Sequence, residues 1–336
     1  MFFSRSKSKL GVDIGTSSIK VAQIKQENEK YILETYGVVN VSLPQKSSTR
    51  FDAIAETAQI LKQLVAKSGA TTNKIVASLP NSIVFVSTIE MPAMSDKEMK
   101  QAIEWEARRY VPLPLEEVTL SWSVMREPGA SQVKVLLTAV PSAVIENYLK
   151  MFKIVGLEPK ALGIEALALI RSLIGPKKES FIIVDIGART SSLNLVDKGF
   201  LRVSRNLSVG GETITQAIAQ SLKISPARAE AFKRNMGLSK NIGQIPKAMR
   251  PALDTMKSEI EQLINIYESS GGAIAEVVLT GNGSNLPGLP DFFSTIGPKI
   301  TLGDPLKFLS YDQGVKPSLT NIAPALSVAI GLGMRD

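Results

Sequence analysis

The sequence predicts an α/β protein with two similar lobes that face each other across a cleft. The stretch VDIGTSSIK at 12–20 returns in similar form as VDIGARTSSLN at 184–194. Each copy begins with β-branched apolar residues, reaches an aspartate, bends at a glycine and continues with hydroxyl side chains. Each copy also lies in the same longer pattern of three strands followed by a helix. Repetition of the whole block favours two related lobes over a chance repeat of a short turn.

The first copy of the block predicts a β-meander and a helix. Short alternating runs separated by turn residues predict strands at 9–15, 18–26 and 31–41. The helix at 51–69 repeats apolar residues at helical spacing and ends at a glycine. We assign residues 1–72 to the first lobe.

The second copy repeats this order. Strands are predicted at 180–187, 191–197 and 200–209, and the helix at 212–225 follows them. A further helix at 224–237, a long helix and a strand at 276–281 continue the lobe. We assign residues 179–317 to the second lobe and residues 318–336 to a closing helix.

The segment between the two copies has a different order of strands and helices. Strands at 74–80 and 84–92, a helix at 95–110, strands at 120–127 and 133–141 and a helix at 142–156 give the order β-β-α-β-β-α. Ser95 and Glu98 form the pattern of a capping box at the start of the first of these helices. We expect residues 73–157 to form a subdomain inserted into the first lobe, and residues 158–178 to return to that lobe.

Composition excludes several kinds of chemistry. The chain has no cysteine and no histidine, which rules out disulfides, thiol nucleophiles, His-ligated metals and Ser-His-Asp hydrolysis. The net charge of +8 is dispersed and not interleaved with aromatic residues, so no nucleic-acid partner is expected. No apolar run approaches the roughly 18 residues of a membrane span, and the start lacks the apolar core of a signal peptide. These features predict a cytoplasmic location.

The repeated turn has the chemistry of a phosphate site. Its glycine lets the backbone bend and bring amides against an anion. Asp13 ends its strand where a carboxylate suits a hydrated Mg²⁺, and Lys20 offers a point charge to phosphate oxygens. Asp185 is expected to do the same for the second lobe. The glycines and hydroxyls expected around the phosphates are Gly15, Thr16, Ser17, Ser18, Gly187, Thr190 and Ser191. Two copies would clamp one triphosphate and its metal ion between the lobes.

The remaining sequence patterns are weaker evidence for a nucleotide site. A single turn of this kind commonly just ends a strand, and neither a Walker loop nor a dinucleotide fingerprint is present. The spacing of Gly281 and Gly283 after a predicted strand would let a base or ribose approach the backbone, although an ordinary loop has the same composition. Glu230 and Lys233 share a helix flank, and such flanks are usually only solvated.

Taken together, these motifs resemble those of the actin-like ATPase superfamily, which has a ribonuclease-H-like fold and includes actin, heat-shock chaperones, sugar kinases and the division protein FtsA. LGVDIGTSSIK and IIVDIGARTSSLNLV resemble its two phosphate motifs, IEALALIR and APALSVAIGLG its connecting helices, and LTGNGSNLPGL its adenosine motif. The resemblance implies ATP and Mg²⁺ as ligands, with Asp13 and Asp185 organising the metal and Glu165 orienting the attacking water. It implies phosphate contact near Gly210 and Gly211, and nucleoside contacts at Glu230, Lys233, Gly281, Gly283 and Ser284.

The position and order of the inserted subdomain resemble FtsA, and AIEWEARRYVPLPLEEVTLSW at 102–122 looks more specifically like the PilM family of type IV pilus assembly proteins. That resemblance implies binding of the N-terminal cytoplasmic peptide of a PilN-like inner-membrane protein, contact with pilus motor and platform proteins, and room for self-association. The apolar stripe of the helix at 95–110 is expected to be core. Its end mixes aromatic residues with arginines, as interfaces do, at Trp105, Arg108, Arg109, Tyr110 and Val111.

Two other functions stay open. An FtsA-like filament protein of division or partition would share the fold. A small-molecule kinase of the superfamily would need an aspartate base aimed at a substrate hydroxyl, and the sequence offers no convincing one. We expect ATP binding with slow hydrolysis at most, and a peripheral position at the inner membrane through the partner protein.

Overall fold

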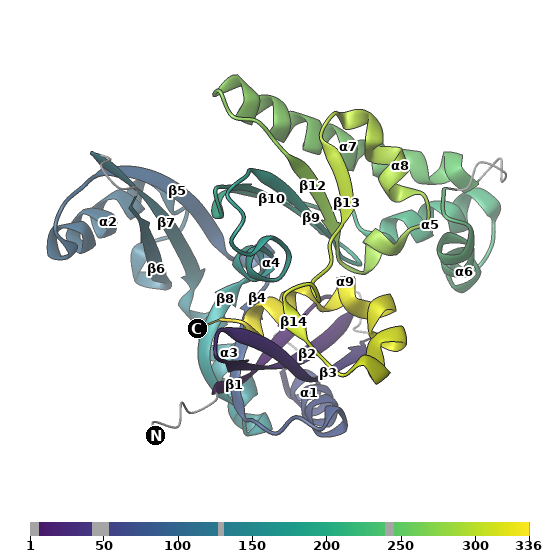
Figure 1. Ribbon diagram of the computed structural model, residues 1–336, viewed down its shortest axis with the longest axis horizontal. Coiled ribbons are helices and arrows are strands. Elements are labelled where there is room, and N and C mark those ends of the chain that lie inside the picture. The colour runs from purple at the N-terminus through teal and green to yellow at the C-terminus, as the bar shows by residue number, and fades with distance from the viewer. Residues whose placement is uncertain (1–6, 42–53, 127–130, 239–244, 336) are drawn as a thin grey trace.

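The computed structural model describes residues 7–41, 54–126, 131–238 and 245–335. Three sheets organise these residues, two large and one small (Figure 1). Residues 51–53 of the first predicted helix and Glu127 of a predicted strand lie outside the described residues.

The first large sheet belongs to the first lobe. Its strands run in the order β14-β3-β2-β1-β4-β8. β1 to β3 form an antiparallel meander, and β4 and β8 continue parallel to β1. The strands are β1 Lys7–Ile14, β2 Ser18–Glu27, β3 Lys30–Asn40, β4 Lys74–Leu79, β8 Glu158–Ile164 and β14 Leu309–Ser310.

Helices cover both faces of this sheet. α1 (Ile54–Ser68) and α3 (Ser142–Val155) pack on one face, where Leu61 and Phe152 are fully buried against the strands. α9 (Lys316–Gly333) covers the other face. It lies so close to β1 that a Cβ on Gly11 would stand 1.9 Å from the Ala329 carbonyl oxygen. Tight packing of α9 therefore fixes the strand that carries Asp13.

The second large sheet repeats the arrangement of the first. Its order is β11-β10-β9-β12-β13, with an antiparallel meander followed by two parallel strands. The strands are β9 Phe181–Ile186, β10 Ser191–Asp197, β11 Phe200–Leu207, β12 Glu276–Thr280 and β13 Lys299–Leu302. The equivalent order in the first sheet is β3-β2-β1-β4-β8, so the duplication predicted from the sequence is confirmed.

Helices of the second lobe lie on its outer side, and two further helices lie between the large sheets (Figure 1). The outer group is α5 Gly211–Leu222, α6 Pro226–Met236, α7 Ile245–Ser269 and α8 Leu289–Phe293. α4 (Glu165–Leu169) continues as a π-helical turn at Ile170–Ile174 and packs on β9 and β12, with α9 beside it. No helix of the described ranges is long and apolar enough to cross a membrane.

The small sheet has three antiparallel strands in the order β5-β7-β6. They are β5 Phe85–Pro92, β6 Val118–Met125 and β7 Gln132–Pro141, and α2 (Asp96–Tyr110) packs on one face. The predicted capping box is confirmed, because the Ser95 side chain accepts from the Glu98 amide while the Glu98 carboxylate accepts from the Ser95 amide. Of the predicted apolar stripe of Met99, Ala102, Ile103, Ala107 and Tyr110, three residues are buried (Met99, Ile103 and Ala107), Ala102 is half-buried and Tyr110 is 42% exposed.

The inserted segment differs from the prediction in two of its six elements. The order β-β-α-β-β-α is found, but β4 and α3 belong to the first lobe rather than to the small sheet. β4 has five consecutive buried residues, Ile75 to Leu79, so it needs cover on both faces and lies between β1 and β8. The part built on the small sheet is therefore 85–141, shorter than the predicted 73–157.

Candidate functional site

Asp13 lies at the carboxyl end of β1 and is only 4% exposed. Its two carboxylate oxygens have different partners from the neighbouring strands. The Ser78 hydroxyl on β4 donates to Oδ1 at 3.0 Å, and the Lys20 ammonium on β2 donates to Oδ2 at 2.9 Å. Both contacts satisfy a carboxylate that has almost no access to water.

Lys20 connects the two acidic turns. Burial lowers the pKa of the Lys20 ammonium, but the neighbouring Asp13 carboxylate, its hydrogen bond, and the charges of Asp185 and Glu165 outweigh burial and leave the pKa raised. Since three carboxylates from β1, β9 and α4 act on one ammonium, the two lobes bring the predicted acids to a common place.

Asp185 lies near the end of β9 as Asp13 lies near the end of β1, but among the described residues no Lys or Arg forms an ion pair with it. It is half-buried in a densely packed region. Burial raises the pKa of its carboxyl, the Lys20 charge lowers it and the Asp13 charge raises it, with a net value of about 6. Asp13 thus has a direct ion pair with Lys20, while burial makes the carboxyl of Asp185 harder to ionise.

The donor set fits a hydrated Mg²⁺ better than a metal held by protein alone. Across the described ranges, no three Asp, Glu, His or Cys side chains gather as a metal site. Mg²⁺ usually keeps several waters and takes one or two carboxylates together with substrate phosphates. Asp13 and Asp185 supply that number of carboxylates.

The residues of the first turn differ in their exposure to solvent. Thr16 is exposed, and Gly15, Ser17 and Ser18 are half-buried. A Cβ on Gly15 would lie 2.7 Å from the Lys20 ammonium nitrogen, so glycine keeps that side of the ammonium open. Of these residues, Gly15 lies directly beside the Lys20 ammonium.

The second turn follows the prediction only in part. The Gly187 amide donates to the Thr190 carbonyl at 3.0 Å and closes the turn, and Thr190 is exposed. Ser191, however, is 1% exposed and its hydroxyl donates to the Val209 carbonyl at 2.7 Å. The expectation that Ser191 faces phosphates is not met, because its hydroxyl joins β10 to the end of the meander.

The glycine pair fixes this turn to α5. The amides of Gly211 and Glu212 donate to the carbonyls of Gly187 and Ala188, so they hold the turn instead of standing free. A Cβ on Gly210 would lie 2.5 Å from the Ala188 carbonyl oxygen, which explains why glycine occurs there. Gly210 and Gly211 therefore lie beside the turn that follows β9, and their contact with phosphate stays a prediction.

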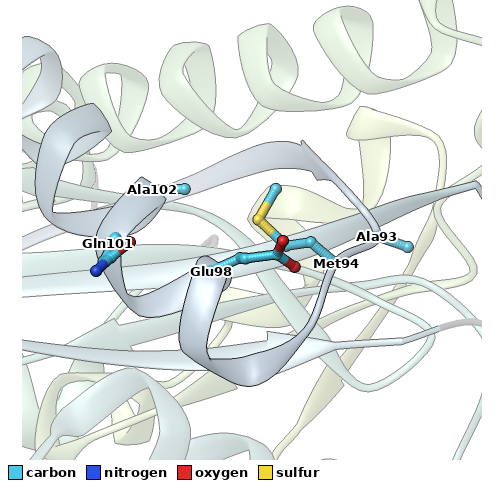
Figure 2. Close-up of a pocket in the computed structure, with 5 residues that line it drawn as sticks. All are labelled: Ala93, Met94, Glu98, Gln101 and Ala102. Carbon is cyan, nitrogen blue, oxygen red and sulfur yellow. The ribbon is translucent and has the colours of Figure 1, made fainter.

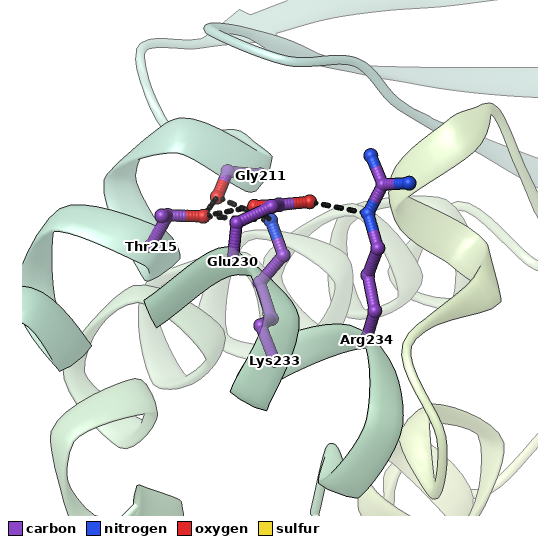
Figure 3. Close-up of polar contacts among 5 residues, drawn as sticks. All are labelled: Gly211, Thr215, Glu230, Lys233 and Arg234. Atoms are coloured by element: carbon purple, nitrogen blue, oxygen red, sulfur yellow. Dashed lines mark hydrogen bonds and ion pairs between the residues drawn. The ribbon is translucent and has the colours of Figure 1, made fainter. Parts of the chain in front are cut away.

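Glu230 and Lys233 on α6 form a polar cluster with the start of α5 (Figure 3). The Lys233 ammonium donates to the Gly211 carbonyl at 2.9 Å and to the Thr215 hydroxyl at 2.8 Å, and it pairs with Glu230 at 2.6 Å. Three contacts match the three donors of an ammonium. Lys233 therefore joins α6 to Gly211, the first residue of α5.

Burial has a different net effect on the pKa of each member of this pair. Burial raises the pKa of the Glu230 carboxyl, but hydrogen bonds from Lys233, Thr215 and Arg234 lower it to about 2. For Lys233, burial lowers the pKa and the Glu230 partner only partly offsets this effect. Glu230 is the more firmly charged member of the pair.

The loop after β12 uses its glycines for packing. Gly281 has φ +80°, and a Cβ there would lie 2.2 Å from an Asp185 carboxylate oxygen. A Cβ on Gly283 would lie 2.3 Å from the Ile186 side chain. Ser284 is buried and donates to the Gly281 carbonyl at 2.8 Å. These contacts pack the loop on the end of β9, and the nucleoside contacts of these residues stay a prediction.

The end of α2 shows a mixture of exposed and buried side chains. Trp105 is 64% exposed and Tyr110 42% exposed, and Arg108 and Arg109 are also exposed. Val111 was predicted with them as a partner contact, but it is 7% exposed and belongs to the core under the small sheet. The exposed aromatic and arginine side chains match the predicted interface composition.

A pocket of about 650 Å³ lies beside the first half of α2 (Figure 2). Met94 and Ala102 supply apolar lining, and Glu98 and Gln101 supply polar groups. The convergence of Asp13, Lys20 and Asp185, rather than the volume of this pocket, defines the candidate site.

Ser78 and Thr215 are two site residues that the sequence analysis missed. Ser78 is the one polar side chain in the buried run Ile75 to Leu79, and that contrast was a usable signal. Thr215 offered none, because a threonine on a helix has many structural roles.

The model of the family "Type IV pilus assembly protein PilM" matches residues 11–336. The chain belongs to this family. A PilM chain in a solved PilM–PilN type IV pilus biogenesis complex has a TM-score of 0.84 at 27% identity, with 97% of this chain and 98% of that chain covered. The actin-like fold predicted from the sequence is thereby confirmed.

More distant relatives share the fold. MreB5 of Spiroplasma citri bound to ADP has a TM-score of 0.54 at 12% identity, with 97% of this chain and 94% of that chain covered. The division protein FtsA of Enterococcus faecalis is 24% identical over 85% of this chain and 76% of its own length. FtsA of Streptococcus pneumoniae is 24% identical over 68% of this chain, and the match spans only 55% of that relative.

Proposed function

We propose that this protein is a cytoplasmic, ATP-binding actin-like scaffold of the type IV pilus inner-membrane assembly platform. It would be held at the membrane by binding the N-terminal cytoplasmic peptide of a PilN-like protein, and it would contact pilus motor and platform proteins. Family membership and the likeness to a PilM chain complexed with PilN support this assignment.

The nucleotide part of the proposal depends on one observation, the convergence of Asp13, Lys20 and Asp185 from equivalent strands of the two lobes. Lys20 would bind phosphate oxygens, and the hydroxyls of Thr16, Ser17, Ser18 and Thr190 would donate to them. Asp13 and Asp185 would hold Mg²⁺ through water, and the ion would supply charge neutralisation for the phosphates. Glu230 and Lys233 would lie toward the nucleoside, since their cluster includes Gly211 of the second turn.

We expect binding to matter more than turnover. Glu165 is half-buried at the start of α4 and acts electrostatically on Lys20, so it could orient a water near the phosphates. The chain supplies no histidine as a general base. Closure of the lobes on ATP, rather than repeated hydrolysis, would bias the shape of the partner surface.

Thermal unfolding tests the nucleotide site. ATP with Mg²⁺ at about 100 times the Kd adds about 2.7 kcal/mol to stability, which for a chain of 336 residues raises Tm by about 4 °C. Asp13→Ala and Asp185→Ala should abolish this rise. Asp254→Asn, an exposed acid on α7, is the control and should keep it. An unchanged rise in both site variants would remove these acids from the metal site.

The partner assignment has its own test. A synthetic N-terminal peptide of a PilN-like protein, titrated calorimetrically with and without ATP and Mg²⁺, should bind, and Trp105→Ala should weaken the binding. Absence of binding under both conditions would contradict the pilus assignment.

The FtsA relatives favour one alternative, a filament-forming ATPase of division or partition. Sedimentation separates the two functions. ATP-dependent pelleting without a peptide partner would support the alternative.

A further inference from the structure

Ser78 stands beside Asp13 at a point where the fold has little need of a hydroxyl. It lies in β4, level with Asp13 in the neighbouring β1, because Val12 pairs with Ala77. Its side chain is 1% exposed and its neighbours along β4 are apolar and buried. A hydroxyl in such a strand costs free energy unless it has a hydrogen-bond partner. Its partner here is Oδ1 of Asp13 at 3.0 Å.

We propose that Ser78 is a positioning residue for Asp13, an inference that rests on the proposed nucleotide function. Ser78 acts through the carboxylate and touches neither nucleotide nor metal. By occupying Oδ1 it leaves Oδ2 as the oxygen that meets Lys20. When a phosphate competes for Lys20, the Ser78 hydroxyl remains as the donor that keeps the carboxylate in this orientation.

The second lobe shows that this contact is not a by-product of the repeated fold. Thr280 on β12 pairs with Asp185 and occupies the place that Ser78 occupies beside Asp13. Its hydroxyl bonds to Ser327 at 2.8 Å and to the Pro324 carbonyl at 3.3 Å instead. Only the first of the two equivalent hydroxyls has the neighbouring aspartate as its hydrogen-bond partner.

The chain also offers a matched control. The Ser180 hydroxyl donates to Oδ1 of Asp197 at 3.1 Å and is nearly as buried as Ser78. Ser180 precedes β9, whereas Asp185 ends it, so the two lie about 16 Å apart along an extended strand. Ser180→Ala therefore removes the same kind of bond far from the candidate site.

The experiment is a magnesium titration of the ATP-induced rise in Tm, with a parallel measurement of ATP in EDTA. Loss of a residue that orients a metal-organising carboxylate typically weakens metal affinity about 10- to 100-fold. Ser78→Ala should raise the magnesium concentration at half-maximal effect by about 10-fold or more while the metal-free ATP response stays. Ser78→Thr, which keeps the hydroxyl, should return most of the affinity, and Ser180→Ala should change neither quantity.

The outcomes separate the two proposals. A wild-type protein without any ATP response would contradict the nucleotide function itself. An intact wild-type response with an unchanged magnesium midpoint in Ser78→Ala would overturn the role of Ser78 alone, as would an equal change in Ser180→Ala. If Ser78→Ala fails to fold, Ser78→Cys preserves the volume with a much weaker donor, and the same magnesium shift is expected.

Discussion

Replacing Asp185 by asparagine should stabilise the folded protein at neutral pH. A carboxyl whose pKa is raised in the folded state prefers to be neutral there, so its ionisation near pH 7 opposes folding. Asparagine keeps the shape of the side chain and has no charge. The change therefore removes an electrostatic cost at a residue that we assign to the metal site.

The magnitude follows from the pKa shift. Burial, opposed by Lys20 and assisted by Asp13, moves the pKa of Asp185 from 3.8 to about 6. At about 1.36 kcal/mol for each pKa unit, the cost of ionisation is at most about 3 kcal/mol. Partial exposure of the residue to solvent reduces this figure, and we expect about 1–2 kcal/mol in practice.

The direction of the Asp185 pKa shift determines the pH range over which stability changes. Because the folded pKa is the higher one, the stability that Asp185 contributes is fully present below 3.8 and is lost as pH rises through about 6. The advantage of Asp185→Asn over wild type should thus be small near pH 4, grow up to about pH 7 and then stay constant.

Urea unfolding at one-unit steps from pH 4 to pH 8, without nucleotide or Mg²⁺, measures this difference. Asp254→Asn serves again as the control and should show no such trend. A difference that does not vary with pH, or a variant less stable than wild type at pH 8, would refute the electrostatic reasoning.

Three further predictions use the same unfolding measurements. Lys20→Met should destabilise the protein by about 3–5 kcal/mol, because it leaves the buried Asp13 carboxylate without its cation. Adding Asp13→Asn should recover much of this loss. A double variant as unstable as Lys20→Met alone would contradict the ion pair. Glu230→Gln should be less stable than wild type above pH 4.5, and the gap should close as pH falls toward about 2, where the Glu230 carboxylate takes up its proton. Ile103→Ala, a fully buried position, should cost about 2–5 kcal/mol, whereas Trp105→Ala should change stability by less than about 0.5 kcal/mol and weaken only partner binding.

Local pattern was sufficient to predict the duplicated meanders. Strand alternation, the glycine bends and the capping box at Ser95 depend on residues close in sequence, and each was found where predicted. The meeting of Asp13 and Asp185 followed from symmetry of the two blocks, because equivalent strand ends of facing lobes converge.

The remaining features depend on partners that are distant in sequence. Whether β4 joins the small sheet or the large one depends on β8, about 80 residues later, which supplies its second neighbour. The orientation of the Ser191 hydroxyl depends on its hydrogen bond to the Val209 carbonyl. Glycine is needed at 281 and 283 because the end of β9 lies against both positions. A single sequence shows that a hydroxyl or a glycine is present at these positions, but it does not show which distant residue contacts it in the folded protein.

The two copies of the repeat have the same register at their aspartates but a different residue opposite each one, and that difference accounts for the electrostatics of the site. Asp13 pairs across the meander with Lys20, whereas Asp185 pairs across its own meander with Ser192. One ammonium therefore serves two carboxylates, the first by a direct salt bridge and the second through space. Asp13 is held in place without a ligand, while Asp185 has a raised pKa that an added cation would lower. In the proposed function, a metal–nucleotide complex would stabilise the ionised Asp185 of the second lobe, which would give such a ligand a physical reason to draw the two lobes together.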